Sequence, residues 1–209
     1  MSVDSHDPYL EPGTHCLRNR FGITDPDLLA VVEAETVANR TIELANNPGL
    51  VTVSWDRDHW QNLHLHLFGD LYGWAGQFRT VDISKDGHRF HPVSRLNIAI
   101  GYCTDQIQDL ATGPTLGLDQ LPRRLSAVLS HMNETHPFRE GNGRTQRTLI
   151  GQIANTHGAH IDWTQIDPEE NITASKAAGH NEHAFAELLT RATRPLPYRD
   201  TPSGGRRRD

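Results

Sequence analysis

The feature that most constrains this chain is a twelve-residue stretch, 136–147, set between two segments with helical periodicity. Before it, residues 121–134 place apolar side chains on one helical face, at Leu125, Val128, Leu129 and Met132. After it, a similar period continues through Leu149, Ile150 and Ile153. The sequence Glu140-Gly-Asn-Gly therefore stands at a helix–loop–helix junction, where glycines permit positive φ and let backbone N–H groups converge. Because the second helix adds the positive end of its dipole, the junction predicts an anion-binding site.

The polar side chains of this stretch have the chemistry to handle a nucleotide phosphate. Arg144 and Arg147 are three residues apart, so both can bind phosphate oxygens at one opening. Glu140 can supply the single protein carboxylate that Mg²⁺ commonly takes beside phosphates and waters. The ordinary pKa of histidine suits His136 to act as a general base. Together they predict nucleotidyl or phosphoryl transfer to a hydroxyl, although each piece alone is more often a turn, a solvated helix face or a structural histidine.

The stretch resembles the signature of the Fic family, His-x-Phe-x-(Asp/Glu)-Gly-Asn-Gly-Arg-x-x-Arg. Every fixed position is filled, by His136, Phe138, Glu140, Gly141, Asn142, Gly143, Arg144 and Arg147. The resemblance runs from Leu17 to Leu189 and implies a mainly α fold, a helical bundle with one β-hairpin flap over the active site. It also implies an enzyme that transfers AMP from ATP to a Tyr, Thr or Ser hydroxyl of a target protein.

The resemblance implies roles for the catalytic and metal-binding positions. His136 would be the general base, and Phe138 would fix the loop by packing into the core. Glu140 would hold Mg²⁺ against the α- and β-phosphates. The implied cofactors are therefore ATP, as a substrate, and Mg²⁺.

The same resemblance implies the phosphate contacts. The backbone of Gly141 and Gly143, with Asn142, would form the anion hole, while Arg144 and Arg147 would bind the β- and γ-phosphates. The related death-on-curing branch resembles a phosphotransferase that uses the nucleotide reversed, and it carries lysine where this chain has Gly143. Since a lysine there would fill the room of a γ-phosphate, Gly143 favours AMP transfer.

Residues 80–92 carry the one convincing β signal. Val81 and Ile83 alternate with polar residues, and Asp86-Gly87 is a strong hairpin turn. A lone hairpin has two exposed edges, which suit capture of an extended peptide by strand addition, although it can also be a stabilising ornament of the fold. In the family such a hairpin lies over the active site and docks the target. The resemblance thus assigns target positioning to Ile83, Lys85, Asp86, Gly87, His88 and Phe90.

The length of 209 residues fits one domain. We divide it into an N-terminal lead-in (1–24), the Fic domain (25–195) and a flexible tail (196–209) that contains three consecutive arginines. For this tail, a secretion signal or a phosphate contact is the other interpretation. Periodicity and capping residues predict helices over residues 25–46, 55–72, 92–110, 121–135, 145–156, 172–178 and 182–193, with a further helix start at Asp167-Pro168.

Composition limits the partners and the compartment. The net charge is −6, so the chain has no basic field that marks a nucleic-acid binder, and we expect protein partners and no direct nucleic-acid binding. Its thirteen histidines, including His59, His64 and His66, form no zinc-type spacing with Cys16 or Cys103. We find neither a Sec-type signal nor a membrane-spanning apolar run. We expect a cytoplasmic protein without a membrane partner, and secretion as an effector stays open.

The sequence lacks a pattern that would indicate inhibition by its own helix. Many Fic proteins carry, or receive from a partner, an inhibitory helix with (Ser/Thr)-x-x-x-Glu-(Gly/Asn). Here Glu140 and Glu170 are followed by Gly and Asn, but His136 and Ile166 stand where Ser or Thr is required. The chain therefore resembles a stand-alone, toxin-like member whose small antitoxin would insert a glutamate beside Arg147, or a member without such inhibition. A topoisomerase subunit is the target expected by resemblance.

Two other functions stay open. One is a phosphotransferase or other nucleotidyl transferase that uses the same loop. The other is a non-catalytic, nucleotide-sensing module that holds a partner on the hairpin. The intact His136 argues against the second, because a pure binder needs no base at this position.

Overall fold

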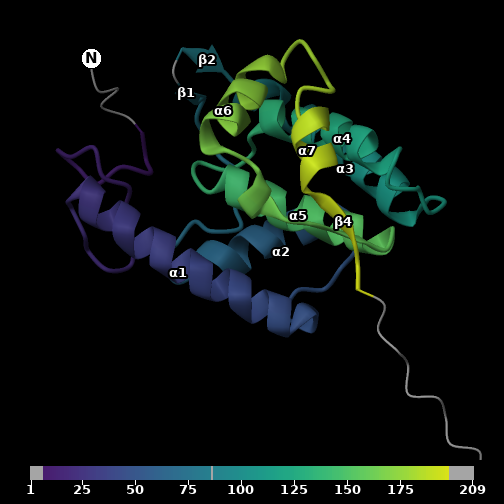
Figure 1. Cartoon of the computed structure of the whole chain (residues 1–209). Helices are drawn as coiled ribbons and strands as arrows, with labels where there is room; N and C mark the ends of the chain where they lie inside the picture. Colours follow the sequence, from purple (N-terminus) through teal and green to yellow (C-terminus); the bar gives the residue numbers. More distant parts are fainter. Residues whose placement is uncertain (1–6, 86, 198–209) are drawn as a thin grey trace, which may run out of the picture.

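The computed structural model describes residues 7–85 and 87–197, which form a mainly helical bundle (Figure 1). The α-helices in these ranges are α1 (Pro26–Asn46), α2 (Arg57–Phe68), α3 (Val93–Thr112), α4 (Leu121–Thr135), α5 (Asn142–Thr156), α6 (Pro168–Ala177) and α7 (Ala186–Ala192). Two short 3₁₀ helices are η1 (Pro48–Leu50) and η2 (Trp163–Gln165). The predicted mainly α fold is confirmed. Within the described ranges, none of the helices is long and apolar enough to cross a membrane.

In the part of the chain that the structure describes, two small antiparallel sheets accompany the helices. The flap hairpin pairs β1 (Ser84–Lys85) with β2 (His88–Arg89), and its strands are shorter than the sequence pattern predicted. The second sheet pairs β3 (Ala159–Ile161) with β4 (Thr193–Pro195). The expectation of a single β element was therefore wrong. Three-residue strands carry too little alternation to be recognised, and this pairing joins segments that are distant in the sequence.

Capping residues place most helix starts where the sequence predicted them. Asp25 accepts hydrogen bonds from the backbone of α1, and Asp167 does the same for α6. Several helix boundaries differ from the prediction, and α7, for example, begins at Ala186 instead of Glu182. The second helix ends at Phe68 instead of Tyr72, because the chain then enters a series of turns, and α5 begins at Asn142 instead of Thr145.

The core surrounds the helix–loop–helix segment. Helix α4 packs against α3, α5 and α7, and α5 packs against α2 (Figure 1). Phe138, from the loop between α4 and α5, is fully buried in this core beside Trp60, so its expected packing is present. Burying one such aromatic side chain contributes about 1.5–3 kcal/mol. The loop that carries the polar site is thus fastened by its own phenylalanine.

Helix α1 and the lead-in form a second apolar cluster against α2. Cys16 of the lead-in and Leu29 and Val37 of α1 are buried there with Leu67. The division at residue 24 stays a prediction, as does the tail, most of which lies outside the described residues.

A buried arginine joins the flap to the α4–α5 loop. Arg79 is 2% exposed and donates hydrogen bonds from Nε to the carbonyl of His136 at 2.8 Å and from Nη1 to that of Val81 at 2.9 Å. Its Nη2 donates to the carbonyl of His91, at the other end of the flap. The backbone N–H of Arg79 also donates to Pro137 at 2.8 Å. One side chain therefore fixes both ends of the flap relative to His136.

We predict that Arg79→Met lowers the free energy of unfolding by about 3 kcal/mol, because it removes a buried charge-assisted donor from several partly buried carbonyls. Arg89→Met, on the exposed face of the flap, is the matched control and should change that free energy by less than about 0.5 kcal/mol. Urea unfolding followed by circular dichroism measures both values. Equal effects in the two variants would contradict this role of Arg79.

Candidate functional site

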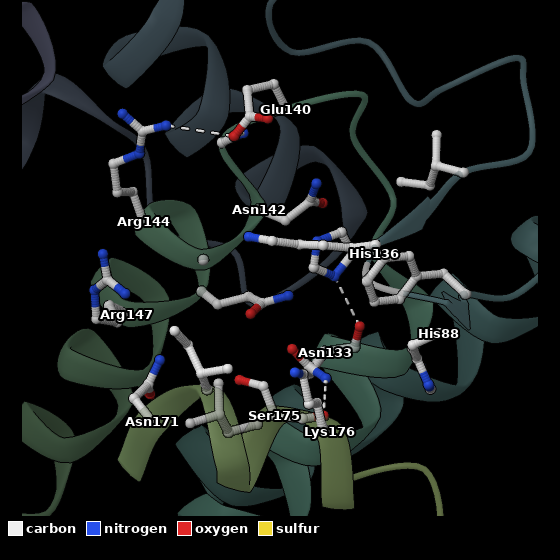
Figure 2. A pocket seen from close by; sticks show the side chains of 18 of the residues that line it. His88, Asn133, His136, Glu140, Asn142, Arg144, Arg147, Asn171, Ser175 and Lys176 are labelled. Atoms are coloured by element: carbon white, nitrogen blue, oxygen red, sulfur yellow. Dashed lines mark hydrogen bonds and ion pairs between the residues drawn. The ribbon is translucent and has the colours of Figure 1, made fainter. Parts of the chain in front are cut away.

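The predicted motif opens into a pocket of about 440 Å³, a size typical of small-molecule sites. Figure 2 shows its walls: motif residues on one side, and α6 with Asn171, Ser175 and Lys176 on the other. The flap contributes a third wall through side chains that include Ile83, Lys85, His88 and Phe90. Segments from three parts of the chain therefore meet around the residues that the sequence singled out.

His136 ends α4 in a left-handed backbone conformation, with φ 43°. This conformation is uncommon for residues other than glycine and persists only where neighbours hold it. Here the N–H of His136 donates to Met132 and its carbonyl accepts from Arg79. On the ring, Nδ1 donates to the carbonyl of Asn133 at 2.8 Å, which leaves Nε2 as the acceptor. The imidazole therefore has a fixed tautomer, and its Nε2 has no hydrogen-bond partner among the described residues.

Phe90 covers the imidazole of His136. The two rings are stacked, with centroids 3.8 Å apart and an angle of 14° between their planes. Burial lowers the pKa of His136 from 6.5 to about 4, since a charged imidazole is poorly solvated there. At neutral pH the ring is unprotonated and able to accept a proton.

The start of α5 forms the predicted anion-binding junction. Gly141 has φ 78°, and a Cβ at this position would lie 2.4 Å from Cζ of Phe68, so only glycine fits. No side chain caps the first N–H groups of α5. The side chain of Asn142 does not face this junction, because it is buried and exchanges two hydrogen bonds with the backbone of Phe138. Its amide closes the loop, and the first N–H groups of α5 are left for an anion, whereas the N–H of Gly141, also predicted for the anion hole, donates to Oε1 of Glu140.

The two motif arginines have different surroundings. Arg144 forms an ion pair with Glu33 of α1, with its Nη2 2.5 Å from Oε1 of that residue. The same Nη2 lies 3.5 Å from Oε1 of Glu140. Arg147 forms no hydrogen bond or ion pair with any residue that the structure describes, and burial lowers its pKa. A Cβ at Gly143 would meet only Nη1 of Arg147, at 3.7 Å, so space is open beside this guanidinium. A half-buried arginine that no carboxylate of the described residues pairs with is suited to an anionic ligand.

Glu140 fits the role of a lone Mg²⁺ ligand. Its side chain is 45% exposed in the pocket wall, and Oε1 accepts from the backbone N–H of Gly141 at 2.8 Å. Within residues 7–85 and 87–197 there is no group of three acidic, histidine or cysteine side chains that could hold a metal. One carboxylate matches Mg²⁺ only where phosphates and waters complete the coordination.

His64 supports Glu140 from behind. Its Nε2 donates to the carbonyl of Glu140 at 3.0 Å, and its Nδ1 accepts from the N–H of Gly76 at 2.9 Å. The ring is stacked on Phe138, with centroids 3.9 Å apart, and burial lowers its pKa to about 4. This histidine has a structural role in the loop.

The structure places the flap residues unequally. Ile83 and Lys85 line the pocket, whereas Gly87 forms the turn with φ 82°, and Asp86 lies outside the described residues. His88 also lines the pocket, with Nε2 3.1 Å from Oε2 of Glu134 on α4. Like Phe90, it is engaged with the body of the protein.

The residues of the wall opposite the motif could not be assigned from the sequence. It combines apolar and polar side chains from η2, α6 and the segment before α7: Trp163, Asn171, Ile172, Ser175, Lys176 and Phe185. The carbonyl of Asn133 was missed as well, because a backbone contact leaves no trace in the residue pattern. These groups become part of the site only through the packing of α6 and α4 around the loop.

Comparison with known sequences gives consistent relatives. The sequence model described as the Fic/DOC family matches residues 54–154. The protein adenylyltransferase VbhT of Bartonella schoenbuchensis is 38% identical over 190 residues, which cover 90% of this chain but 39% of VbhT. The probable protein adenylyltransferase y4lH of Sinorhizobium fredii is 31% identical over 169 residues, covering 80% of this chain and 85% of the relative.

Solved structures share the fold. BepC of Bartonella tribocorum, crystallised with AMPPNP, has a TM-score of 0.80 at 20% identity and covers 93% of this chain and 100% of its own. An N-terminal Fic domain from Bartonella quintana with bound ADP has a TM-score of 0.78 at 22% identity and covers 90% and 95%. These likenesses establish the helical architecture around the motif.

We predict that Phe90→Ala raises the pKa of His136 above about 4 toward its ordinary value of 6.5, because water then reaches the imidazole and solvates its charged form. NMR titration of the imidazole measures this pKa directly. The matched control is Ile83→Ala, on the same flap, which should leave the pKa unchanged. No shift in Phe90→Ala would show that the stacked ring does not keep His136 neutral.

Proposed function

The chain belongs to the Fic/DOC family, and from this we propose that it is a protein adenylyltransferase, transferring AMP from ATP to a hydroxyl of a target protein. The observation that carries the proposal is His136, a neutral base with a free Nε2 in the pocket that also contains Arg147 and the start of α5. Relatives named protein adenylyltransferases support it. The match covers 39% of VbhT, so the activity that VbhT is named for is a proposal for this chain.

In the proposed reaction, His136 accepts the proton of the target hydroxyl at Nε2. The hydroxyl oxygen then forms a bond to the α-phosphorus of ATP, the bond from that phosphorus to the bridging oxygen breaks, and pyrophosphate leaves. A neutral imidazole is required at the start of this step, and burial keeps it neutral. The hydrogen bond to Asn133 stabilises the imidazolium that forms.

The phosphates are proposed to lie between the start of α5 and Arg147. The uncapped N–H groups of α5 and its positive dipole end favour an anion at this place. Arg147 has open space beside it at Gly143, which suits a γ-phosphate and argues against reversed nucleotide binding. When Mg²⁺ is held by Glu140, it neutralises charge on the phosphate oxygens.

The adenosine part is proposed to contact the wall formed by η2 and α6. Trp163, Ile172 and Phe185 offer apolar surface for a planar base, and Asn171 offers an amide for hydrogen bonding. Pockets with apolar walls and a few polar groups are typical of nucleotide sites. Figure 2 shows Asn171 on the side of the cavity away from Glu140, and both residues line the pocket.

The target segment is proposed to dock on the flap near Ile83 and Lys85. His88 and Phe90 are occupied by Glu134 and His136, so the first strand is the part of the flap left for a partner. An extended peptide that adds to β1 would bring a hydroxyl toward His136. We also propose that the target is a topoisomerase subunit and that the chain is the toxin of a toxin–antitoxin pair.

We expect His136→Ala to reduce AMP transfer by about 10²–10⁴-fold, because the proton acceptor is lost, while ATP affinity is kept. The measurement is intact mass of the chain and of lysate proteins after incubation with ATP and Mg²⁺. His131→Ala, on the same helix and outside the pocket lining, is the matched control and should retain activity.

The mass identifies the reaction. An added AMP supports the proposal. An added phosphate would replace it with phosphotransfer, and no adduct despite ATP binding would replace it with nucleotide sensing.

Arg147 allows a prediction about inhibition. Since no carboxylate of the described chain pairs with Arg147, we expect the purified chain to transfer AMP without an activating step. A separate antitoxin glutamate would then be the proposed inhibitor. The rate of AMP incorporation by the chain alone measures this. An inactive chain that becomes active when one of its own glutamates is replaced would contradict the prediction.

A further inference from the structure

Helix α1 supplies a carboxylate to the motif that the sequence pattern did not include. Oε1 of Glu33 accepts a hydrogen bond from Nη2 of Arg144 at 2.5 Å. Glu33 is 9% exposed and does not line the pocket, whereas Arg144 does. Glu33 therefore contacts the arginine from behind, on the side away from the ligand space.

Glu33 is itself held by an aromatic cluster. The hydroxyl of Tyr72 donates to its Oε2, so the two carboxylate oxygens face two different donors. Burial, together with this hydrogen bond to Glu33, raises the pKa of Tyr72, which keeps the phenol protonated as a donor. The ring of Tyr72 is stacked on Trp74, with centroids 4.3 Å apart. The carboxylate of Glu33 thus has little freedom to rotate.

The contacts of Arg144 use only one edge of its guanidinium. Nη2 serves both Glu33 and Glu140, and Cζ lies 4.8 Å from the ring centre of Phe68. Nε and Nη1 have no hydrogen-bond partner in the part of the chain that the structure describes. The guanidinium is therefore held at one edge and on one face, and its other donors remain for a ligand.

We propose that Glu33, held by Tyr72, is a positioning residue that fixes Arg144 for binding a nucleotide phosphate. This rests on the proposed function, in which Arg144 contacts the β-phosphate. A long side chain that is already ordered loses less freedom when it binds, so its contribution to affinity is larger. Glu33 lies on α1, outside residues 54–154, which are the stretch that the family model matches. The residue that positions Arg144 therefore comes from a helix outside the matched stretch.

If Glu33 instead competed with the phosphate for Arg144, its removal would change ATP affinity in the opposite direction. A carboxylate that competes with phosphate for Arg144 would weaken ATP binding, and its removal would strengthen it. Positioning predicts that removal weakens binding, even though the site becomes more positive. The sign of the change in ATP affinity therefore decides between the two roles.

The experiment is calorimetric titration of the full chain with ATP and Mg²⁺. We expect Glu33→Ala to weaken ATP binding by about tenfold, the size of one charge-assisted hydrogen bond. Tyr72→Phe, which keeps the stacked ring, should weaken it less. Glu35→Ala removes the same charge from an exposed position of α1 and should have no effect. Thermal unfolding in the same buffer verifies that each variant is folded.

A double-mutant cycle tests whether Glu33 acts through Arg144. In an Arg144→Ala background, Glu33→Ala should change ATP affinity by less than about twofold. An unchanged tenfold loss in that background, or tighter binding in the single variant, would overturn the proposal. Failure of the proposed function can be distinguished from failure of the Glu33 proposal. It would appear as absent ATP binding or absent AMP transfer in the unmodified chain. Tyr72→Phe allows the same cycle if Glu33→Ala does not fold.

Discussion

The site depends on the left-handed backbone of His136, which turns the chain sharply between α4 and the start of α5. That conformation is held by the guanidinium of Arg79, which binds the His136 carbonyl and both ends of the flap. Because one buried cation satisfies all of these carbonyls, the base and the surface proposed to receive the target form one rigid unit. The turn also brings Nδ1 of His136 onto the carbonyl of Asn133 and leaves Nε2 toward the pocket.

Burial acts in opposite ways on the ionisable groups around the pocket. For His136, burial disfavours the charged imidazole and leaves a neutral ring that can act as a base. Arg147 stays charged and is half-buried, and no carboxylate in residues 7–85 or 87–197 pairs with it, so an anion can stabilise this cation. The same loss of water thus supports both proton transfer and phosphate binding. Arg144 differs from Arg147, because Glu33 and Glu140 already balance its charge.

Helix α1 links the peripheral part of the chain to the site. It packs on α2 through an apolar cluster, and Glu33 is placed by that packing at the edge of the motif. Phe68 of α2 belongs to this apolar cluster and also contacts the motif, since its ring lies against Gly141 and under the guanidinium of Arg144. A change in how α1 packs would therefore reach Arg144 without altering any motif residue.

The sequence by itself determined the helical class, the starts of α1 and α6, and the loop that joins His136 to Arg147, because periodicity, capping and motif spacing act over a few residues. The resemblance to the Fic family also implied that Phe138 packs into the core. Only the tertiary structure decided that Arg79 binds His136, that Glu33 binds Arg144, and that α6 closes the pocket. These contacts join residues far apart in the chain, so they depend on how the helices pack. The β3–β4 pairing was hidden for the same reason.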